Sequence, residues 1–531
     1  MHNNCLLSNI RKLGVAAAVA VSALTMTTSA FAQDAKPYGP DPEEEIRGGN
    51  LMVGSLVEPP SLDPFHDGSD GRIRVTTLVY QGLFYEAMSG PVPLLAKSYE
   101  VSEDGLTYTF NLREGIKFHT GQDMTAADVK YSYDYIRDPD NGSPGAGDYT
   151  TVESIEVVDD YTVVFNLDQP NASLPITLGN KYGAVVPAGT FDDPGARAAL
   201  NRESVGTGPF KISAFETNSY LELTAFEDYW QEGLPYLDAV TYLFMPNNAA
   251  LLVALRNERI DFAQLGRPQD SQQLKGVDHL NIQRWESLGQ KPLDLDSDYG
   301  PLQDVRVRQA IALTVDKEEI LQASLGGYGT VIHTIPAAMQ DTWGVPVEEL
   351  EFQTRDVERA KELMAEAGYA DGVEMDLTTI NGYDWMDPAA VTLREQLSEI
   401  GITLNIKRVD LGVWIDNFRN HNMGLTFNDW PTLPDPNMLF FRHFHQRPEG
   451  ADFRNWNNEE ASALLREGRS TSDPEKRKEI YAEFQKILDR TVPTIMLFSA
   501  DIVTVANDKV HNLYQHPTGW YFGLAKTQLE E

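Results

Sequence analysis

The segment from Pro93 to Tyr133 constrains the fold most, because it holds a strand pattern, a turn and a helix start in direct succession. Between residues 106 and 112, apolar side chains alternate with polar ones, which predicts a strand with one buried face. Thr125, followed three residues later by Asp128, predicts the N-terminal cap of a helix. The segment therefore predicts a strand, a tight turn and a helix packed in sequence.

The C-terminal half of the chain alternates between helix and strand patterns. Helix starts are predicted at Asp304, Asp316, Thr354, Asp387 and Asp473. Alternating apolar residues at 402–406 predict a strand between two of these helices, and the apolar run 491–505 predicts a final strand. Such alternation predicts an α/β fold with a mixed sheet covered by helices.

Several longer motifs occur in a characteristic order. They are EPPSLDP at 58–64, SYEVSEDGLTYTFNLREGIKFH at 98–119, VGTGPFK at 205–211, DVRVRQAIA at 304–312, EAGY at 366–369 and PDP at 434–436. In these motifs the chain resembles the family 5 extracellular solute-binding proteins, the periplasmic receptors of ABC importers for dipeptides, oligopeptides, nickel, opines and some oligosaccharides. The resemblance covers roughly residues 46–531.

The resemblance implies a class C periplasmic binding protein, with two lobes, a hinge and three domains, of which the central one is discontinuous. We expect a signal peptide at 1–32 and a flexible tail at 33–47. The expected central α/β domain combines 48–82, 203–293 and 491–531, because the family's C-terminal strand rejoins it. Residues 83–202 are expected to form an inserted domain, and 294–490 the second ligand-binding lobe.

The first 32 residues have the features of an export signal. A basic pair precedes an apolar run from Leu13 to Met26, and Ala30–Ala32 matches an Ala-x-Ala cleavage site. The run is shorter than the roughly 20 residues of a spanning helix. The only cysteine, Cys5, precedes the run, so cleavage would leave a protein with neither disulfide nor lipid anchor. These features predict a periplasmic protein of a Gram-negative bacterium.

The formal charge of −36 excludes some partners. An acidic chain is repelled by nucleic-acid phosphates and by anionic lipid, so neither is expected to bind. The charge itself is typical of a soluble exported protein, which we expect to be a monomer.

Motifs of enzymes and metal sites are missing from the sequence. There is no G-x-S-x-G elbow, H-E-x-x-H helix, phosphate-binding Walker loop or cysteine pair. His443 and His445 would share one side of an extended segment, but two ligands beside Arg442 and Arg447 do not complete a cation site. We therefore expect a binding protein without catalysis, cofactor or metal. A hydrolase or a chaperone-like binder is the alternative from another class.

In the family, the ligand lies between the segment around Ser61 and Leu62 and the segment before Asp435–Pro436, and peptide binders use both as strand edges. Aromatic walls with a few polar groups suit such a cleft. The expected ligand-binding residues are Ser61, Leu62, Trp285, Tyr383, Trp385, Asn428, Asp429, Trp430 and Thr432. For each tryptophan, ordinary core packing is the alternative.

One position departs from the pattern of the peptide-binding members. These members carry an aspartate three residues before the aspartate of the D-P motif, where it pairs with the α-ammonium group of the peptide. Thr432 occupies that position here, and its hydroxyl cannot offset the desolvation of a buried ammonium. Asp429 could substitute for it if the loop is longer.

The sequence thus predicts the substrate-binding component of an ABC importer, which captures a peptide-like solute by lobe closure and delivers it to inner-membrane permease subunits. An oligosaccharide, opine or other polar solute is the alternative ligand, favoured by Thr432.

Overall fold

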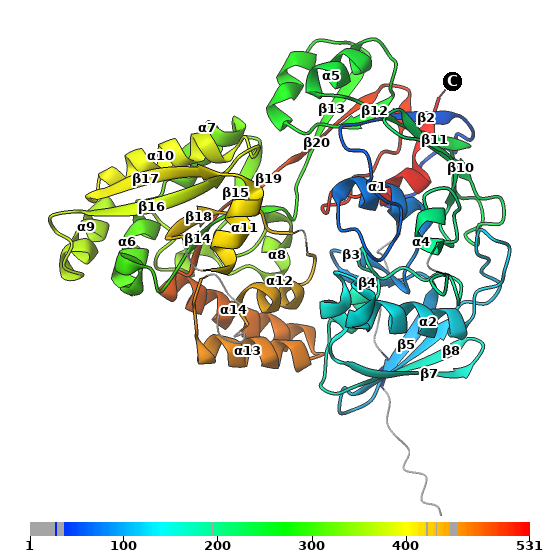
Figure 1. The fold of residues 1–531 in the computed structure, drawn as a ribbon, viewed down its shortest axis with the longest axis horizontal. Coiled ribbons are helices and arrows are strands. Elements are labelled where there is room, and N and C mark those ends of the chain that lie inside the picture. Colours follow the sequence, from blue (N-terminus) through cyan, green and yellow to red (C-terminus); the bar gives the residue numbers. More distant parts are fainter. Residues whose placement is uncertain are drawn as a thin grey trace, which may run out of the picture.

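The computed structural model of the chain describes residues 27–28, 37–193, 195–420, 423–431, 433–445 and 454–530. Apart from Thr27 and Thr28, the expected signal peptide lies outside these residues. Within them the chain forms two lobes that stand side by side and join at one end (Figure 1). The large sheets are mixed or antiparallel and carry helices, which confirms the predicted α/β fold.

The first lobe contains two large sheets. The seven-stranded sheet has the order β13 (Leu280–Trp285), β20 (Ile502–Asn507), β12 (Phe262–Gln264), β2 (Asn50–Ser55), β11 (Ala239–Phe244), β10 (Tyr220–Ala225) and β9 (Phe210–Glu216). The five-stranded antiparallel sheet has the order β1 (Thr27–Thr28), β5 (Ala96–Val101), β6 (Thr107–Leu112), β8 (Thr162–Leu167) and β7 (Val152–Asp159). Cleavage after residue 32 would remove β1 and leave the other strands.

Helices and hairpins of the first lobe connect and flank these sheets. The helices are α1 (Asp70–Val79), α2 (Ala126–Arg137), α3 (Leu174–Thr177), α4 (Ala196–Ala199) and α5 (Asn248–Arg256). The hairpin of β3 (Phe84–Ala87) and β4 (Gly90–Pro93) lies next to α3, and β21 (Val510–His511) pairs with β22 (Gln528–Leu529). One core of buried apolar side chains runs through both sheets of this lobe.

The second lobe is built on a six-stranded sheet. Its order is β15 (Gly329–Val331), β19 (Thr494–Ala500), β14 (Gln290–Leu295), β18 (Leu425–Phe427), β16 (Val373–Ile380) and β17 (Ile402–Val409). The helices are α6 (Val305–Thr314), α7 (Lys317–Leu325), α8 (Gln340–Trp343), α9 (Val357–Glu366), α10 (Met386–Ser398), α11 (Leu411–Arg419), α12 (Pro436–Phe444), α13 (Glu459–Ser470) and α14 (Pro474–Thr491). Helices α12, α13 and α14 form a group that faces the first lobe (Figure 1).

Short 3₁₀ turns complete the described secondary structure. They are η1 (Pro139–Asn141), η2 (Ala146–Tyr149), η3 (Pro268–Leu274), η4 (Gly300–Gln303), η5 (Ala337–Met339), η6 (Val347–Glu349) and η7 (Phe522–Lys526).

The chain passes between the two sheets twice within a short distance. Residues 286–289 connect β13 of the first lobe to β14 of the second, and Asp501 separates β19 from β20. The predicted single strand at 491–505 is therefore wrong, because it consists of two strands in different sheets. Nearly every side chain of both strands is buried. The run is therefore apolar throughout, and its residue pattern does not indicate where the chain passes from one sheet to the other.

The predicted helix starts agree with the structure where a side chain caps the N-terminus of the helix. Thr125 and Asp128 form the predicted capping box of α2. Asp304, Asp316 and Asp473 each accept a hydrogen bond from a backbone N–H in the first turn of the predicted helix. Between residues 107 and 112, buried side chains alternate with half-buried ones, as predicted.

Two predicted helix starts shift by a few residues. The helix expected from Thr354 begins at Val357, because Asp356 is the residue that caps it. The helix expected from Asp387 begins one residue earlier, at Met386.

Part of the predicted flexible tail, within residues 37–47, packs against the folded chain. The Tyr38 side chain is only 2% exposed, and its hydroxyl bonds with Gln81. Lys526 near the C-terminus donates to the Gly39 carbonyl and to Asp41. These contacts join distant parts of the chain, which composition cannot reveal. Residues 33–36 lie outside the described residues.

Candidate functional site

The EPPSLDP segment is anchored to the first lobe by its own backbone and by Asp63. The Leu62 side chain is fully buried, and its backbone N–H donates to Asn201 at 2.7 Å. Burial raises the pKa of the Asp63 carboxyl, but hydrogen bonds from His66, Phe65 and Arg197 outweigh it and lower that pKa below its usual value. Leu62 can therefore offer a solute only its carbonyl group, while Ser61 remains partly exposed.

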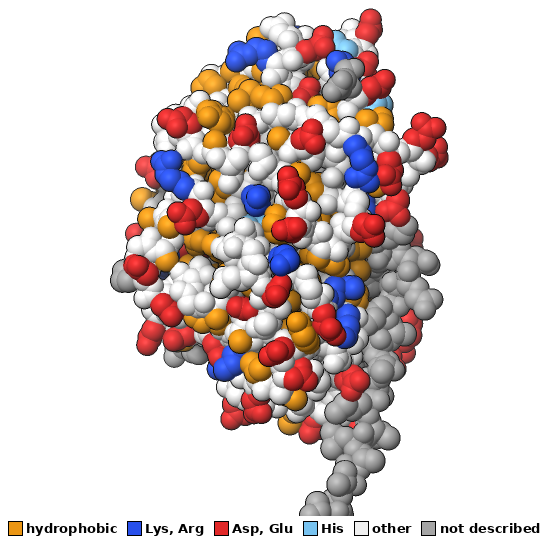
Figure 2. Space-filling view, turned by 90° about the vertical axis from the view of Figure 1, so that its right-hand side faces the viewer, with side chains coloured by type: hydrophobic (Ala, Val, Ile, Leu, Met, Phe, Trp, Pro, Cys, Tyr) orange, Lys and Arg blue, Asp and Glu red, His pale blue; other side chains and the backbone are white. Residues whose placement is uncertain are grey.

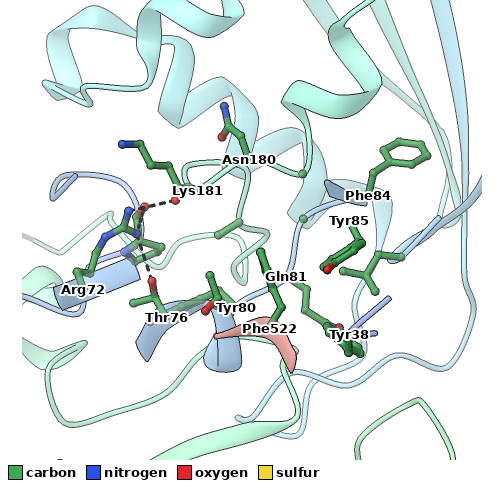
Figure 3. A pocket seen from close by; sticks show the side chains of 16 residues that line it. Tyr38, Arg72, Thr76, Tyr80, Gln81, Phe84, Tyr85, Asn180, Lys181 and Phe522 are labelled. Atoms are coloured by element: carbon green, nitrogen blue, oxygen red, sulfur yellow. Dashed lines mark hydrogen bonds between the residues drawn. The ribbon is translucent and has the colours of Figure 1, made fainter. Parts of the chain in front are cut away.

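Arg72 of α1 holds the EPPSLDP segment in place through hydrogen bonds to backbone carbonyl groups. Its guanidinium donates to the Pro64 carbonyl at 2.8 Å and to the Lys181 carbonyl at 3.1 Å. Figure 3 shows the side chain reaching from α1 toward Lys181 and Thr76. The adjoining cavity holds only about 40 Å³, which suits a few water molecules and excludes a peptide.

Four of the expected ligand-binding residues lie together in the second lobe, near the start of β14. Asn428 donates to Asp294 at 3.0 Å, and Asp429 forms an ion pair with Lys291. The Lys291 ammonium also lies 5.8 Å from the centre of the Trp385 ring, and the Asp429 carboxylate raises the pKa of Tyr383 in addition to the larger effect of burial. Because Lys291 already neutralises Asp429, this carboxylate is not an unpaired receptor for an ammonium group.

The tryptophans have packing roles. The Trp430 side chain is 2% exposed and stacks on the His443 ring at 4.0 Å. Trp385 is 7% exposed and contacts Phe427. Trp285, the last residue of β13, donates from its indole N–H to Thr504 at 2.9 Å. Little of the Trp385 and Trp430 rings is left for a solute, and a ligand role for any of the nine residues stays a prediction.

Thr432, the residue that departs from the peptide-binding pattern, lies outside the described residues. The histidine pair lies on helix α12 and its C-cap, not on an extended segment. His443 stacks on Trp430, whereas His445 stacks on Phe441 at 4.0 Å. In the part of the chain that the structure describes, no three His, Cys, Asp or Glu side chains converge as metal ligands.

Asp435 of the D-P motif connects three elements and both lobes. Its carboxylate caps α12 by accepting from the backbone N–H of Asn437, and it pairs with Arg477 of α14 at 2.9 Å. Ser173, which follows β8 in the first lobe, donates its hydroxyl proton to the same carboxylate at 2.9 Å. Next to it, the Ala172 N–H donates to the Arg469 carbonyl at 2.7 Å. The two lobes are therefore in contact at this point.

A second contact between the lobes is made by the β3–β4 hairpin. Met88 at its turn packs against the apolar cluster of the second lobe that contains Trp430 and Phe440. Glu86 on the same hairpin is 1% exposed, and burial raises the pKa of its carboxyl group well above the usual value.

Next to Ser173, which makes the first of these contacts, lies a pocket of about 690 Å³. It is large enough for a small organic solute. From the first lobe its lining consists of Pro144, Gly147, Asp148, Thr150, Asn171, Ser173 and Thr177, and from the second of Leu433, Asn437, Met438, Phe441, Arg442, His445 and Arg469. None of the eight expected residues that the structure describes lines this pocket.

One sequence signal could have indicated three residues of this lining. Asn437, Phe441 and His445 are spaced by four residues after the capping Asp435, so they share one face of a helix. The first-lobe residues come from the loops around η2 and α3, and only the tertiary structure brings them to that face.

Charged side chains do not gather into a single site on the one face of the molecule seen in Figure 2. On the outer face of the first lobe, acidic side chains outnumber basic ones but are spread among them and do not form one patch (Figure 2). Among the described residues, no helix combines the length and apolar character needed to cross a bilayer.

Comparison with known proteins places this architecture. Residues 90–451 match the model of the bacterial extracellular solute-binding proteins, family 5. The glutathione-binding protein GsiB of Salmonella paratyphi A is 26% identical over 479 residues, covering 87% of this chain and 91% of that protein. The dipeptide-binding protein of Escherichia coli is 26% identical over 456 residues, covering 81% of this chain and 84% of that protein.

Solved structures show the same architecture over nearly the whole chain. The ABC transporter substrate binding protein CtaP of Listeria monocytogenes has a TM-score of 0.82 at 25% identity, covering 91% of this chain and 100% of its own. The periplasmic binding protein DppA of Helicobacter pylori, in complex with the peptide STSA, has a TM-score of 0.76 at 25% identity, covering 92% and 99%. The chain with two lobes and a pocket between them therefore belongs to family 5 of the bacterial extracellular solute-binding proteins.

Proposed function

We propose that the protein captures a peptide or peptide-like solute between its lobes in the periplasm and presents it to the permease subunits of an ABC importer. The observation that carries the proposal is the pocket of about 690 Å³, lined from both lobes and bordered by contacts between them. Relatives named for binding glutathione, a dipeptide and the peptide STSA support a peptide as the ligand class.

Two connections between the lobes suit this task. Segment 286–289 and Asp501 are short and lie side by side, because β13 pairs with β20 before them and β14 pairs with β19 after them, as the neighbouring strands in Figure 1 show. A change in a few backbone angles at such connections moves one lobe as a rigid body against the other. We propose that the exported protein acts as a monomer after removal of residues 1–32, and that it binds and releases its solute without chemical turnover.

A polar solute other than a peptide is the second candidate. It is favoured by the ion pair between Lys291 and Asp429, which occupies the carboxylate that could have replaced the missing aspartate as the partner of a peptide α-ammonium. An opine or an oligosaccharide would not need that partner.

The test is native mass spectrometry of the protein isolated from the periplasm, with fragmentation of any solute that it releases. Amino-acid fragments would support the peptide proposal, and hexose or opine fragments would replace it with the second candidate. The same spectra report the oligomeric state. A protein that carries no solute and binds no member of a peptide, opine and oligosaccharide panel would contradict the capture role.

A further inference from the structure

We propose that the pocket between the lobes selects a solute with a carboxylate or similar anionic group, held by Arg469 and Arg442, beside a hydrogen-bond donor that Asn437 accepts. This inference rests on the proposed function and names the chemical class of its solute. It concerns residues of α12 and α13 that line the pocket, together with Asp148 of the first lobe.

Arg469 is a half-buried cation that forms no ion pair with a carboxylate of the described residues. Its guanidinium lies 4.5 Å from the centre of the Phe441 ring, and its Nε atom is buried without a hydrogen-bond acceptor among the described residues. No described carboxylate oxygen lies within 4.0 Å of this guanidinium. Burial lowers the pKa of Arg469, while the more distant Asp168 counteracts it. Because arginine stays charged at neutral pH, an anion in the pocket would supply the missing acceptor.

The second cation of the pocket lining is Arg442 of α12. Arg442 is half exposed, and its guanidinium lies 3.9 Å from Asp148 across the gap between the lobes. Asp148 also accepts a hydrogen bond from Asn180 at 3.0 Å, so it has a partner within its own lobe. A long, partly exposed pair of this kind contributes little, and a solute anion can share Arg442 with Asp148.

Asn437 adds a buried side-chain oxygen that can accept a hydrogen bond from the solute. Its side chain is 5% exposed and lines the pocket, and its Oδ1 atom has no hydrogen-bond donor among the described residues. Buried acceptors without a donor are costly, so a solute N–H or O–H at this position would be favoured. The amide lies one helical turn from Phe441, the ring that supports Arg469.

The formal charge of the residues that line the pocket is opposite in sign to the net charge of the whole chain. Two arginines and one aspartate give the pocket a positive balance, whereas the whole protein carries −36. Phe441, Met438 and Leu433 add an apolar wall. A pocket with apolar walls and convergent cationic groups prefers an anionic solute over its neutral analogue.

The test compares matched acid and amide probes on the full exported chain. The panel contains tripeptides, opine-like N-carboxyalkyl amino acids and uronate-containing oligosaccharides, each with a partner in which the carboxylates are amidated. We expect the acid form of whichever scaffold binds to bind about ten-fold more tightly than its amide. We also expect Arg469→Gln to abolish that preference and Arg469→Lys to restore part of it.

Arg394→Gln serves as the matched control, because Arg394 is an exposed arginine of α10 outside the pocket. Thermal unfolding of each variant verifies that it is folded. Equal binding of acid and amide forms overturns this inference alone, as does a preference that survives the double change Arg469→Gln and Arg442→Gln. Failure of every probe to bind overturns the capture role as well.

Discussion

At the scale of single residues, the buried charged side chains differ in how well their charge is compensated by neighbouring groups. Asp435 satisfies a helix cap, a buried arginine and a serine of the other lobe at once, so its carboxylate is fully used. Lys317 is a contrasting case. Its ammonium is buried and donates to the Ile332 carbonyl and to Gln353, without a direct ion pair among the described residues.

Lys317 predicts a pH dependence of stability. Burial lowers the pKa of Lys317 from 10.5 to about 7, although Asp489 opposes the shift. The unfolded chain then binds one more proton than the folded chain between about pH 7 and pH 10.5, so stability rises with pH in this window. We expect the free energy of unfolding of the wild type to increase with pH relative to that of the Lys317→Met variant, by up to about 1.4 kcal/mol per pH unit.

Urea denaturation at several values between pH 7 and pH 9 measures this difference. Lys361→Met is the control, because the Lys361 side chain is exposed beside Glu358, and its difference from the wild type should stay constant. Parallel stability curves for the wild type and Lys317→Met would contradict the prediction.

At the scale of secondary-structure elements, loops from one lobe meet helix ends of the other. The loop that follows β8 contacts α12 and α14 through Ser173, Asp435 and Arg477. Asp435 keeps its capping and ionic bonds when Ser173 is removed, so this serine can be changed without unfolding α12.

Ser173→Ala is therefore expected to weaken closure and leave the fold intact. A hydrogen bond of this kind contributes about 1 kcal/mol, which corresponds to roughly five-fold weaker solute binding, mainly through faster dissociation. Stopped-flow dissociation of the solute recovered from the periplasm measures the effect. Ser398→Ala, at the exposed end of α10, is the control. A dissociation rate equal to that of the wild type would argue against a role of this contact in closure.

At the scale of elements, the sequence predicts helices best where an aspartate caps them. Asp304, Asp316 and Asp473 mark their helices because an N-cap is a local hydrogen bond between neighbours in the sequence. The division of 491–505 into β19 and β20 could not be predicted, since both strands are buried and equally apolar. The pocket lining escaped prediction because half of it comes from loops that carry no motif.

At the scale of the whole molecule, two short connections join the two lobes, and we predict that the lobes close on the solute. Small-angle X-ray scattering with and without the recovered solute tests this directly. We expect a smaller radius of gyration and an unchanged mass when the solute saturates the pocket, because the lobes move as rigid bodies. Superimposable profiles would contradict closure.

The sequence by itself determined the family, the α/β class and the capped helices, because motifs and caps depend on residues close together in the chain. Tertiary structure alone decided where the sheets exchange strands, which tryptophans are buried and which side chains of the two lobes meet. Ser173 and Asp435 lie 262 positions apart and form one hydrogen bond. Contacts of this kind arise from the packing of whole domains, and no local pattern encodes them.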